Sequence, residues 1–214
     1  MRKKGMSYSQ IKTELDIPKS TLSNWLHEYP LSRERINELR ARSEQRIEKF
    51  RLAFQLKRER RLTAFLEEAK KKMFPLSLRE MLVGGLFLYW GEGSKTGWGM
   101  AGVTNTDPRV LKFFCFWLTT FCQIKKSQMR VRLQLYKDMD QSREIHFWSH
   151  TLGIRSRQFV KPQIKNTKVS RINYKGTFGH GTCTVIVYKV PLKERIMMQI
   201  KAIAEHSWAS SSVG

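Results

Sequence analysis

Apolar residues near the start of the chain recur at the intervals expected for two short helices joined by a tight turn. Between Tyr8 and Leu26 the apolar positions are Ile11, Leu15, Ile17, Leu22 and Trp25. This spacing directs one side of each helix into a shared small core. The sequence therefore predicts a helix-turn-helix over residues 1–30, a module too small to be stable alone.

Residues 31–73 contain no Gly or Pro and predict one long helix, in which a break is allowed and Ser32 is the N-cap. Apolar side chains recur there at steps of three and four, at Ile36, Leu39, Ile47, Phe50, Phe54, Leu62, Phe65, Ala69 and Met73. Sustained heptads are missing, so a strong coiled coil is not indicated. We favour a connector helix packed on the main domain. A dimerising or DNA-tracking helix is the alternative.

Helical and strand-like patterns alternate from residue 74 onward. Ser77 and Glu80 form a capping box that opens an apolar helix ending near Gly91, and Asp107 with Pro108 marks another helix start. Further helices are expected over 141–152 and 191–206, and strands near 100–104, 129–136, 169–174 and 182–188. These patterns predict an α+β domain with an antiparallel sheet over 74–206, followed by a flexible tail, 207–214.

The charge balance then narrows the class of partner. The chain has 40 Lys and Arg against 18 Asp and Glu, a formal charge of +22. A chain this basic repels itself unless a polyanion is present, and nucleic acid is the commonest such partner. A ribosome-associated protein, an anionic membrane surface and simple solubility are the alternatives.

The spacing of the cysteines and the lack of a recognisable signal peptide or membrane span favour a cytoplasmic protein. Three cysteines form no CxxC pair, which suits a reducing compartment. The basic start of the chain is followed by no apolar segment of a signal peptide, and residues 84–90 are too few to span a bilayer. We expect a cytoplasmic, nucleoid-associated protein with no membrane partner and no small-molecule substrate.

Polar side chains on the second predicted helix are candidates for contacts with bases and phosphates. They are Lys19, Ser20, Thr21, Ser23, Asn24 and His27, and Lys19 or Ser20 is expected to cap that helix. The segment resembles the helix-turn-helix of resolvases, transposases and small repressors. It departs from them at Lys12, where a small residue is usual, and at Asp16, where glycine is usual.

A second basic region lies in the predicted sheet. Residues 125–175 carry 13 Lys and Arg against three acids, a density that fits a surface tracking phosphates. The candidate DNA-binding residues of this region are Arg130, Arg132, Gln134, Lys161, Lys165, Lys168 and Arg171.

Other polar and sulfur-containing side chains carry weaker signals. His146 and His150 lie four apart on one predicted helix, but no third metal ligand is evident, so a surface or packing role is favoured. Cys115 and Cys122 are expected in the core, and His180 in a turn between two glycines.

The apolar helix after Ser77 contains three glycines and ends on an acid. Glycine costs roughly 1 kcal/mol against alanine inside a helix, so Gly84, Gly85 and Gly91 suggest a close contact between helices. If two copies of this helix cross, their Glu92 side chains converge. Paired carboxylates in such a place can hold a divalent metal for phosphodiester hydrolysis.

Gly91-Glu92-Gly93, at the end of an apolar helix, resembles the motif of the LAGLIDADG homing endonucleases and their derived regulators. The order of the downstream segments 103–108, 130–136, 145–154 and 182–203 is also similar. The resemblance implies a saddle of antiparallel strands lying in the DNA major groove. It also implies Mg²⁺ at Glu92 if cleavage is retained, and a homodimer whose interface includes Gly84, Gly85, Leu88 and Gly91.

The chain departs from that family in the acid itself, which is Glu instead of Asp, in Phe87 where a small residue is usual, and in a shortened hairpin after Gly93. Some members that join this domain to a helix-turn-helix resemble nucleases that have kept only binding. We therefore expect a sequence-specific binder of duplex DNA, most simply a transcription regulator or other non-cleaving binder. A Mg²⁺-dependent site-specific endonuclease using Glu92 across a homodimer is the alternative, and an RNA-binding protein is a weaker one.

Overall fold

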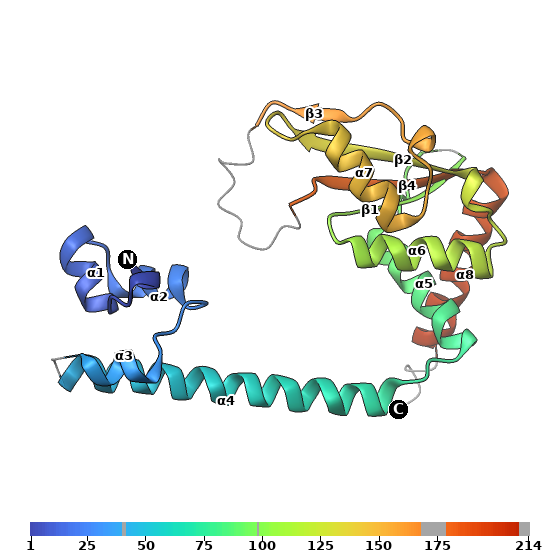
Figure 1. The fold of residues 1–214 in the computed structure, drawn as a ribbon. Helices are drawn as coiled ribbons and strands as arrows, with labels where there is room; N and C mark the ends of the chain where they lie inside the picture. Colours follow the sequence, from blue (N-terminus) through green and yellow to red (C-terminus); the bar gives the residue numbers. More distant parts are fainter. Residues whose placement is uncertain (40–41, 98, 168–178, 210–214) are drawn as a thin grey trace. The chain divides into compact units, whose positions relative to one another are not determined.

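The computed structural model describes residues 1–39, 42–97, 99–167 and 179–209. The chain divides into two compact units, which are Met1–Pro75 (unit 1) and Leu76–Gly214 (unit 2). Figure 1 shows the ribbon coloured along the sequence. The predicted module 1–30 and the predicted connector 31–73 thus belong to one unit. Among the described residues, none of the helices has the length and apolar character that a membrane span requires.

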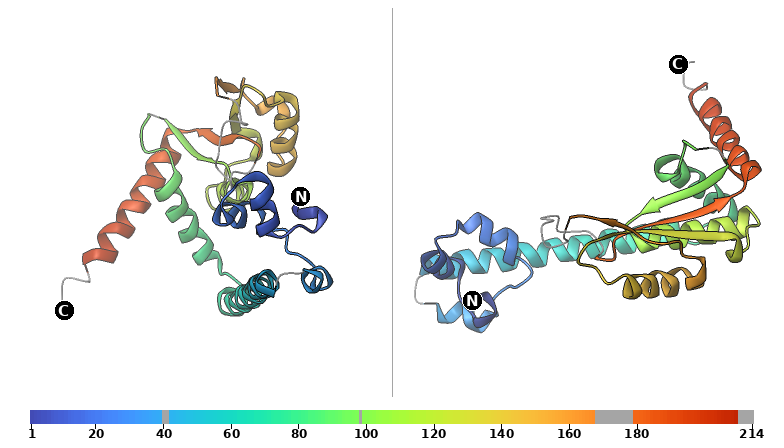
Figure 2. Two further views of the ribbon diagram at one scale, coloured as in Figure 1. Left: turned by 90° about the vertical axis from the view of Figure 1, so that its left-hand side faces the viewer. Right: turned by 90° about the horizontal axis from the view of Figure 1, so that it is seen from above.

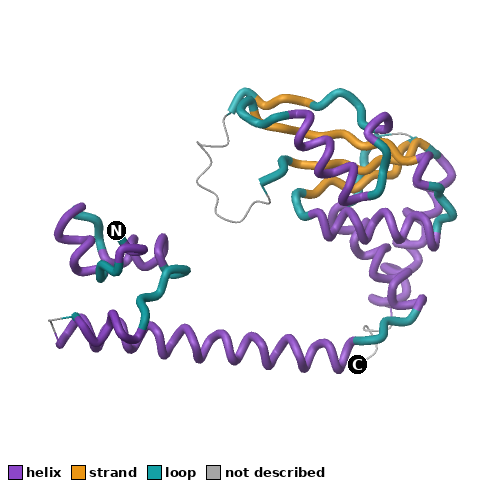
Figure 3. Tube along the Cα trace, in the orientation of Figure 1, coloured by secondary structure: helices purple, strands orange, loops and turns teal. Residues whose placement is uncertain are grey.

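Unit 1 consists of helices and loops and has no strand among its described residues, as the purple and teal tube of Figure 3 shows. Its elements are η1 (Arg2–Lys4), α1 (Tyr8–Leu15), α2 (Lys19–Leu26), α3 (Arg33–Glu38) and α4 (Arg42–Met73). The helix predicted over 31–73 therefore contains the break that the sequence allowed. Ser32 caps α3 as predicted, since its hydroxyl accepts a hydrogen bond from the Arg35 backbone N–H at 3.2 Å.

The turn between α1 and α2 forms as the sequence indicates, but the core beneath it differs. Asp16 adopts the left-handed conformation, with φ of 50°, in the position where glycine is usual. Ile11 and Leu22 are buried as predicted, whereas Leu15 and Trp25 are about half exposed, at 49% and 52%. The prediction for these two residues is wrong because Tyr8, Met6 and Leu26 take the inner positions, and Ile17 packs against the same cluster as predicted.

A buried ion pair joins the start of unit 1 to α4. The Arg2 guanidinium donates to the Glu48 carboxylate at 2.9 Å, and each side chain is only 4% exposed. The guanidinium also lies 4.2 Å from the centre of the Tyr8 ring, and that of Arg51 lies 4.3 Å from the same centre. These contacts connect η1, α1 and α4 within unit 1.

Unit 2 combines four helices with one sheet among its described residues, so the α+β class is confirmed (Figure 2). The helices are α5 (Leu78–Glu92), α6 (Pro108–Phe121), α7 (Gln141–Leu152) and α8 (Val190–Ala209). The strands are β1 (Met100–Asn105), β2 (Met129–Tyr136), β3 (Gln163–Lys165) and β4 (Thr182–Tyr188). The predicted strand 169–174 lies outside the described residues. The last helix runs to Ala209, beyond the end predicted at His206.

The sheet has the strand order β1-β4-β2-β3. β4 pairs antiparallel with both β1 and β2, whereas β3 pairs parallel with β2. The prediction of a wholly antiparallel sheet is therefore wrong at this edge. The cause is α7, which lies between β2 and β3 in the chain and returns it so that both strands run in the same direction.

The core of unit 2 fills the space between the sheet and its helices. Figures 1 and 2 show α5, α6 and α8 on one side of the sheet, and this side carries the buried Val131, Leu133 and Leu135 of β2. Trp117 of α6 is fully buried, and its indole N–H donates to the Leu82 carbonyl at 3.0 Å. The helices leave the opposite face of the strands to polar side chains.

Candidate nucleic-acid interface

The sheet of unit 2 presents a polar face opposite its helices. Residues of β2 alternate between buried and exposed as predicted, and Arg130 and Arg132 are exposed. The strand register adds side chains from the other three strands to the same face. We call this surface the outer face, and its polar side chains are Thr104, Arg130, Arg132, Gln134, Tyr136, Gln163, Lys165, Thr182, Thr184 and Tyr188. The register also places Met100, Gly102 and the buried Ile186 on this face.

One row of the outer face crosses β1, β4 and β2. Thr184 pairs with Thr104 on one side and with Arg132 on the other. The two threonine hydroxyl oxygens lie 2.9 Å apart and share a hydrogen bond. Within the described residues Arg132 makes no hydrogen bond or ion pair, so its guanidinium donors are available to a ligand.

A second row lies one step further along the strands. Gln134 pairs with Thr182 of β4 and with Gln163 of β3, and its amide N–H donates to the Gln163 amide oxygen at 3.3 Å. Beyond it, the Lys165 ammonium lies 5.6 Å from the centre of the Tyr136 ring. This part of the face thus offers amide groups and an aromatic ring beside a cation.

The charged side chains of the outer face are all cationic. None of the four described strands contains Asp or Glu. Strands lie about 4.8 Å apart, so β1, β4 and β2 together span roughly 10 Å, which fits the ~12 Å major groove of DNA. Outward residues two apart on β2 are separated by about 6.8 Å, close to two base steps of ~3.4 Å each.

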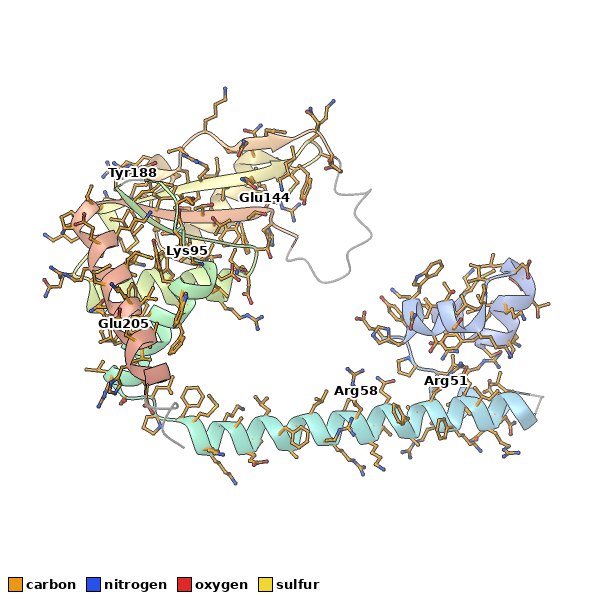
Figure 4. The ribbon with its side chains drawn as sticks, turned by 180° about the vertical axis from the view of Figure 1, so that it is seen from behind. Arg51, Arg58, Lys95, Glu144, Tyr188 and Glu205 are labelled. Atoms are coloured by element: carbon orange, nitrogen blue, oxygen red, sulfur yellow. The ribbon has the colours of Figure 1, made fainter. Side chains whose placement is uncertain are left out.

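Only four residues of this face were predicted from the sequence, namely Arg130, Arg132, Gln134 and Lys165. The threonines, Gln163 and Tyr188 belong to it because of the strand register. β3 is exposed throughout and shows no apolar alternation. Tyr188 is 60% exposed at the end of β4, where Figure 4 labels it. An exposed tyrosine at the end of a buried strand was the available signal.

The remaining basic candidates of unit 2 are dispersed. Lys161 is exposed between the short helix η3 (Ser156–Gln158) and β3. Lys168 and Arg171 lie outside the described residues. Arg109 is neutralised, because its side chain donates to the Asp107 carboxylate at 2.7 Å. These hydrogen bonds also lower the pKa of Asp107.

The N-terminal end of α2 differs from the prediction. Pro18 is the N-cap residue and makes no side-chain capping hydrogen bond, and Lys19 is the first helical residue. The expectation that Lys19 or Ser20 caps the helix is therefore wrong. Proline ends the preceding turn with its fixed φ, so the helix starts one residue earlier.

The candidate residues of α2 differ in their exposure and in what surrounds them. Lys19, Ser20 and Asn24 are exposed, and Thr21 is half-buried. Ser23 and His27 instead line a cavity within unit 1.

Glu92 is the last residue of α5 and is exposed. Just beyond it, the Gly93 N–H donates to the Tyr89 carbonyl at 2.7 Å, and the Tyr89 hydroxyl donates to the Ser94 carbonyl at 2.9 Å. Burial raises the pKa of Tyr89. Among the described residues, no three His, Cys, Asp or Glu side chains come together as a metal site requires.

The glycines of α5 have different surroundings. A Cβ on Gly85 would lie 1.9 Å from Trp117 Cδ1, so this buried residue serves the contact between α5 and α6 of the same chain. Its place in a dimer interface stays a prediction of the resemblance. Gly84 and Gly91 are exposed, and nothing lies within 4 Å of a Cβ built on Gly91. Leu88 is half-buried against the core.

A carboxylate–imidazole pair in unit 2 was not expected from the sequence. His180 Nδ1 lies 2.7 Å from a Glu144 carboxylate oxygen, and the Glu144 side chain is 6% exposed. The His180 ring stacks on Phe147 with 3.4 Å between ring centres, and its carbonyl accepts a hydrogen bond from the Trp148 indole. The predicted turn residue thus anchors the segment before β4 to α7.

Comparison with protein-family models, with curated proteins and with solved structures finds no match for this chain. Its function is therefore argued from the residues of the outer face, of α2 and of α5.

Proposed function

We propose that this protein binds duplex DNA in a sequence-specific way, with the outer face of the sheet in unit 2 as the main contact surface. The observation that carries the proposal is that Arg130, Arg132 and Gln134 lie side by side along the outer face of β2, in a sheet whose described strands contain no acid. The guanidinium groups of Arg130 and Arg132 attract phosphates, and a protein that neutralises phosphates gains affinity from the release of counterions.

The same side chains have the chemistry that distinguishes base pairs. In the major groove arginine donates two hydrogen bonds to guanine, and glutamine makes a two-point contact with adenine. Threonine, present in both rows as Thr104, Thr182 and Thr184, can contact bases or the thymine methyl group. The outer face therefore offers both phosphate binding and base recognition.

The exposed side of α2, with Lys19, Ser20 and Asn24, is the second proposed contact. Small polar residues in the first turns of a helix suit entry into the major groove. The resemblances to helix-turn-helix proteins and to the LAGLIDADG family support the same partner. A non-cleaving binder such as a transcription regulator is favoured, because the acid of the motif is Glu92 instead of the usual Asp and Phe87 stands where a small residue is usual.

Cleavage by a homodimer is the second candidate, and the surface of α5 favours it. Glu92 is exposed at the helix end, and Gly84 and Gly91 leave a narrow open surface beside it. Two chains meeting through this surface would bring two carboxylates together, and these could hold Mg²⁺.

The first test selects the full-length protein on a randomised duplex library with Mg²⁺ and sequences both retained duplexes and newly cut ends. An enriched uncut motif supports the regulator. Cut ends at a defined position that disappear with chelator, or with Glu92→Gln, support the nuclease. Retention with no enriched motif would overturn sequence-specific binding, and stronger binding to structured RNA at the same salt concentration would overturn DNA as the partner.

The outer face is tested with Arg132→Ala on the selected duplex. We expect dissociation constants about ten- to a hundredfold higher, because one good arginine contact is worth about 1–3 kcal/mol. Arg109→Ala is the matched control, since it also removes one exposed cation but one already paired with Asp107. Equal increases in the dissociation constant from the two substitutions would show that the outer face contributes only general positive charge and makes no specific contact.

A further inference from the structure

Unit 1 contains a cavity of about 380 Å³ between α2 and α4. Phe50, Phe54 and Leu62 of α4 line one side, and Ser23 and His27 of α2 line another. Its volume falls within the ~300–1,000 Å³ typical of sites for small molecules. All lining residues belong to unit 1.

Within unit 1, the apolar wall of this cavity is largely uncovered. Phe50 is 71% exposed, Phe54 is 61% exposed and Leu62 is 52% exposed. The two phenylalanine rings stack with 6.3 Å between their centres and 22° between their planes. They form an aromatic surface onto which another flat ring can pack.

The charged groups around the cavity balance one another. The lining includes three arginines and three glutamates, which are Arg2, Arg51, Arg58, Glu28, Glu48 and Glu59. Glu48 is paired with Arg2 at 2.9 Å and with Arg51 at 3.4 Å, and Glu59 accepts a hydrogen bond from Gln55 at 3.0 Å. A ligand without net charge suits such a lining, because burying a charge without a partner is costly.

A second copy of the chain fits this wall poorly. Arg58 lies one helical turn after Phe54 and one turn before Leu62, so it interrupts the apolar face of α4. Figure 4 labels Arg58 on α4, and the described residues offer it no hydrogen bond or ion pair. Two copies paired through this face would bring like charges together.

We propose that the cavity binds a small aromatic molecule without net charge, seated on Phe50 and Phe54 beneath α2. Ser23 and His27 supply the polar groups that orient it. A bound ligand would contact α2, the helix assigned above to DNA, and would thereby influence DNA binding. This regulatory consequence rests on the proposed function, whereas binding of the ligand does not.

The test uses N-phenyl-1-naphthylamine, an uncharged aromatic probe that fluoresces in apolar sites, with the full-length protein and no DNA. We expect saturable binding that is about tenfold weaker in Phe54→Ala, since a lost aromatic contact and its buried area amount to roughly that factor. Phe65→Ala is the matched control, because Phe65 is 57% exposed on the same helix and does not line the cavity. Ser23→Phe, which fills the cavity from α2, should also abolish binding.

Equal affinity of Phe54→Ala and Phe65→Ala would overturn the site. Tighter binding of the sulfonated analogue 1-anilinonaphthalene-8-sulfonate, lost in Arg58→Gln, would overturn the uncharged class of ligand. A dimer that Phe54→Ala dissociates, seen by sedimentation, would assign the wall to a second copy. Since the titration contains no DNA, it can fail while DNA binding by the outer face stands, and the reverse also holds.

Discussion

The two units of this protein bury their apolar residues to very different extents. Unit 1 has two separate clusters of three buried residues, one under α1 and α2 and one at α3. Unit 2 has one continuous core that links all four of its helices to the sheet. A small core leaves little net stability, so a single polar contact counts for more in unit 1 than in unit 2.

Helix capping does not explain this difference in burial, because each unit contains a helix that begins with a capping box. Ser7 and Gln10 form a capping box at the start of α1, and Ser77 and Glu80 form another at the start of α5. In each box the serine hydroxyl accepts from a backbone N–H, and the longer side chain accepts from the serine N–H. Well-capped helices therefore do not by themselves produce a large core.

The largest effect is expected from Glu48→Ala in unit 1. The substitution leaves the Arg2 guanidinium buried without its partner, at a cost of about 3–5 kcal/mol. In hydrogen-exchange mass spectrometry of the full-length protein, α1, α2 and α4 should lose protection while β1, β2 and β4 keep theirs.

Glu38→Ala serves as the control for Glu48→Ala, because Glu38 pairs with Arg35 at 3.0 Å on the exposed surface. An exposed pair contributes about 0–1 kcal/mol, so protection should stay close to that of the unmodified protein. Similar losses from both substitutions, or a loss spread equally over unit 2, would contradict the dependence of unit 1 on its buried ion pair.

A smaller effect is expected from the glycines of α5 in unit 2. Gly85→Ala places a Cβ 1.9 Å from Trp117 Cδ1, and overpacking of this kind costs about 1–3 kcal/mol. Gly91→Ala meets nothing within 4 Å and should stabilise the helix by up to about 1 kcal/mol. Urea denaturation followed by near-ultraviolet circular dichroism should give free energies of unfolding that change in opposite directions. A change of the same sign in both variants would disprove the distinction.

The smallest expected effect is on the reactivity of the cysteine thiols, all of which lie in unit 2. Burial raises the pKa of Cys115 and of Cys122 to about 11, and it also raises the pKa of Cys183 well above the usual thiol value. At pH 8 a thiol of pKa 11 is ionised in about one molecule in a thousand, so reaction with Ellman's reagent should be slow in the folded protein.

These raised pKa values determine how the free energy of unfolding changes with pH. The folded state holds the thiol protons more tightly than the unfolded state does, so the thiols favour folding below about pH 9. That contribution is lost as the pH rises from about 9 toward 11.

Reaction of the thiols with Ellman's reagent should be faster in Gly85→Ala than in the unmodified protein. It should be unchanged in Glu48→Ala, because that substitution opens unit 1 alone. Fast labelling in Glu48→Ala would show that the two units unfold together.

Local patterns in the sequence determined much of this protein. The capping box at Ser77, the helix start at Asp107 and the alternation along β2 all occur as predicted, and Asp16 takes the left-handed conformation of the turn. Such signals act within one helical turn or one strand, so they can be read from neighbouring residues. The positive charge of 125–175 likewise pointed to β2 and β3.

Only the tertiary structure decided which residues meet across the chain. The parallel pairing of β3, the partner of Gly85 and the contact of Thr184 with Thr104 each join positions far apart in the sequence. Burial of Tyr8 in place of Trp25 had the same origin, since both residues suit a small helical core. Strand register and the choice among equally apolar side chains depend on which packing fills space best, and no single segment contains that information.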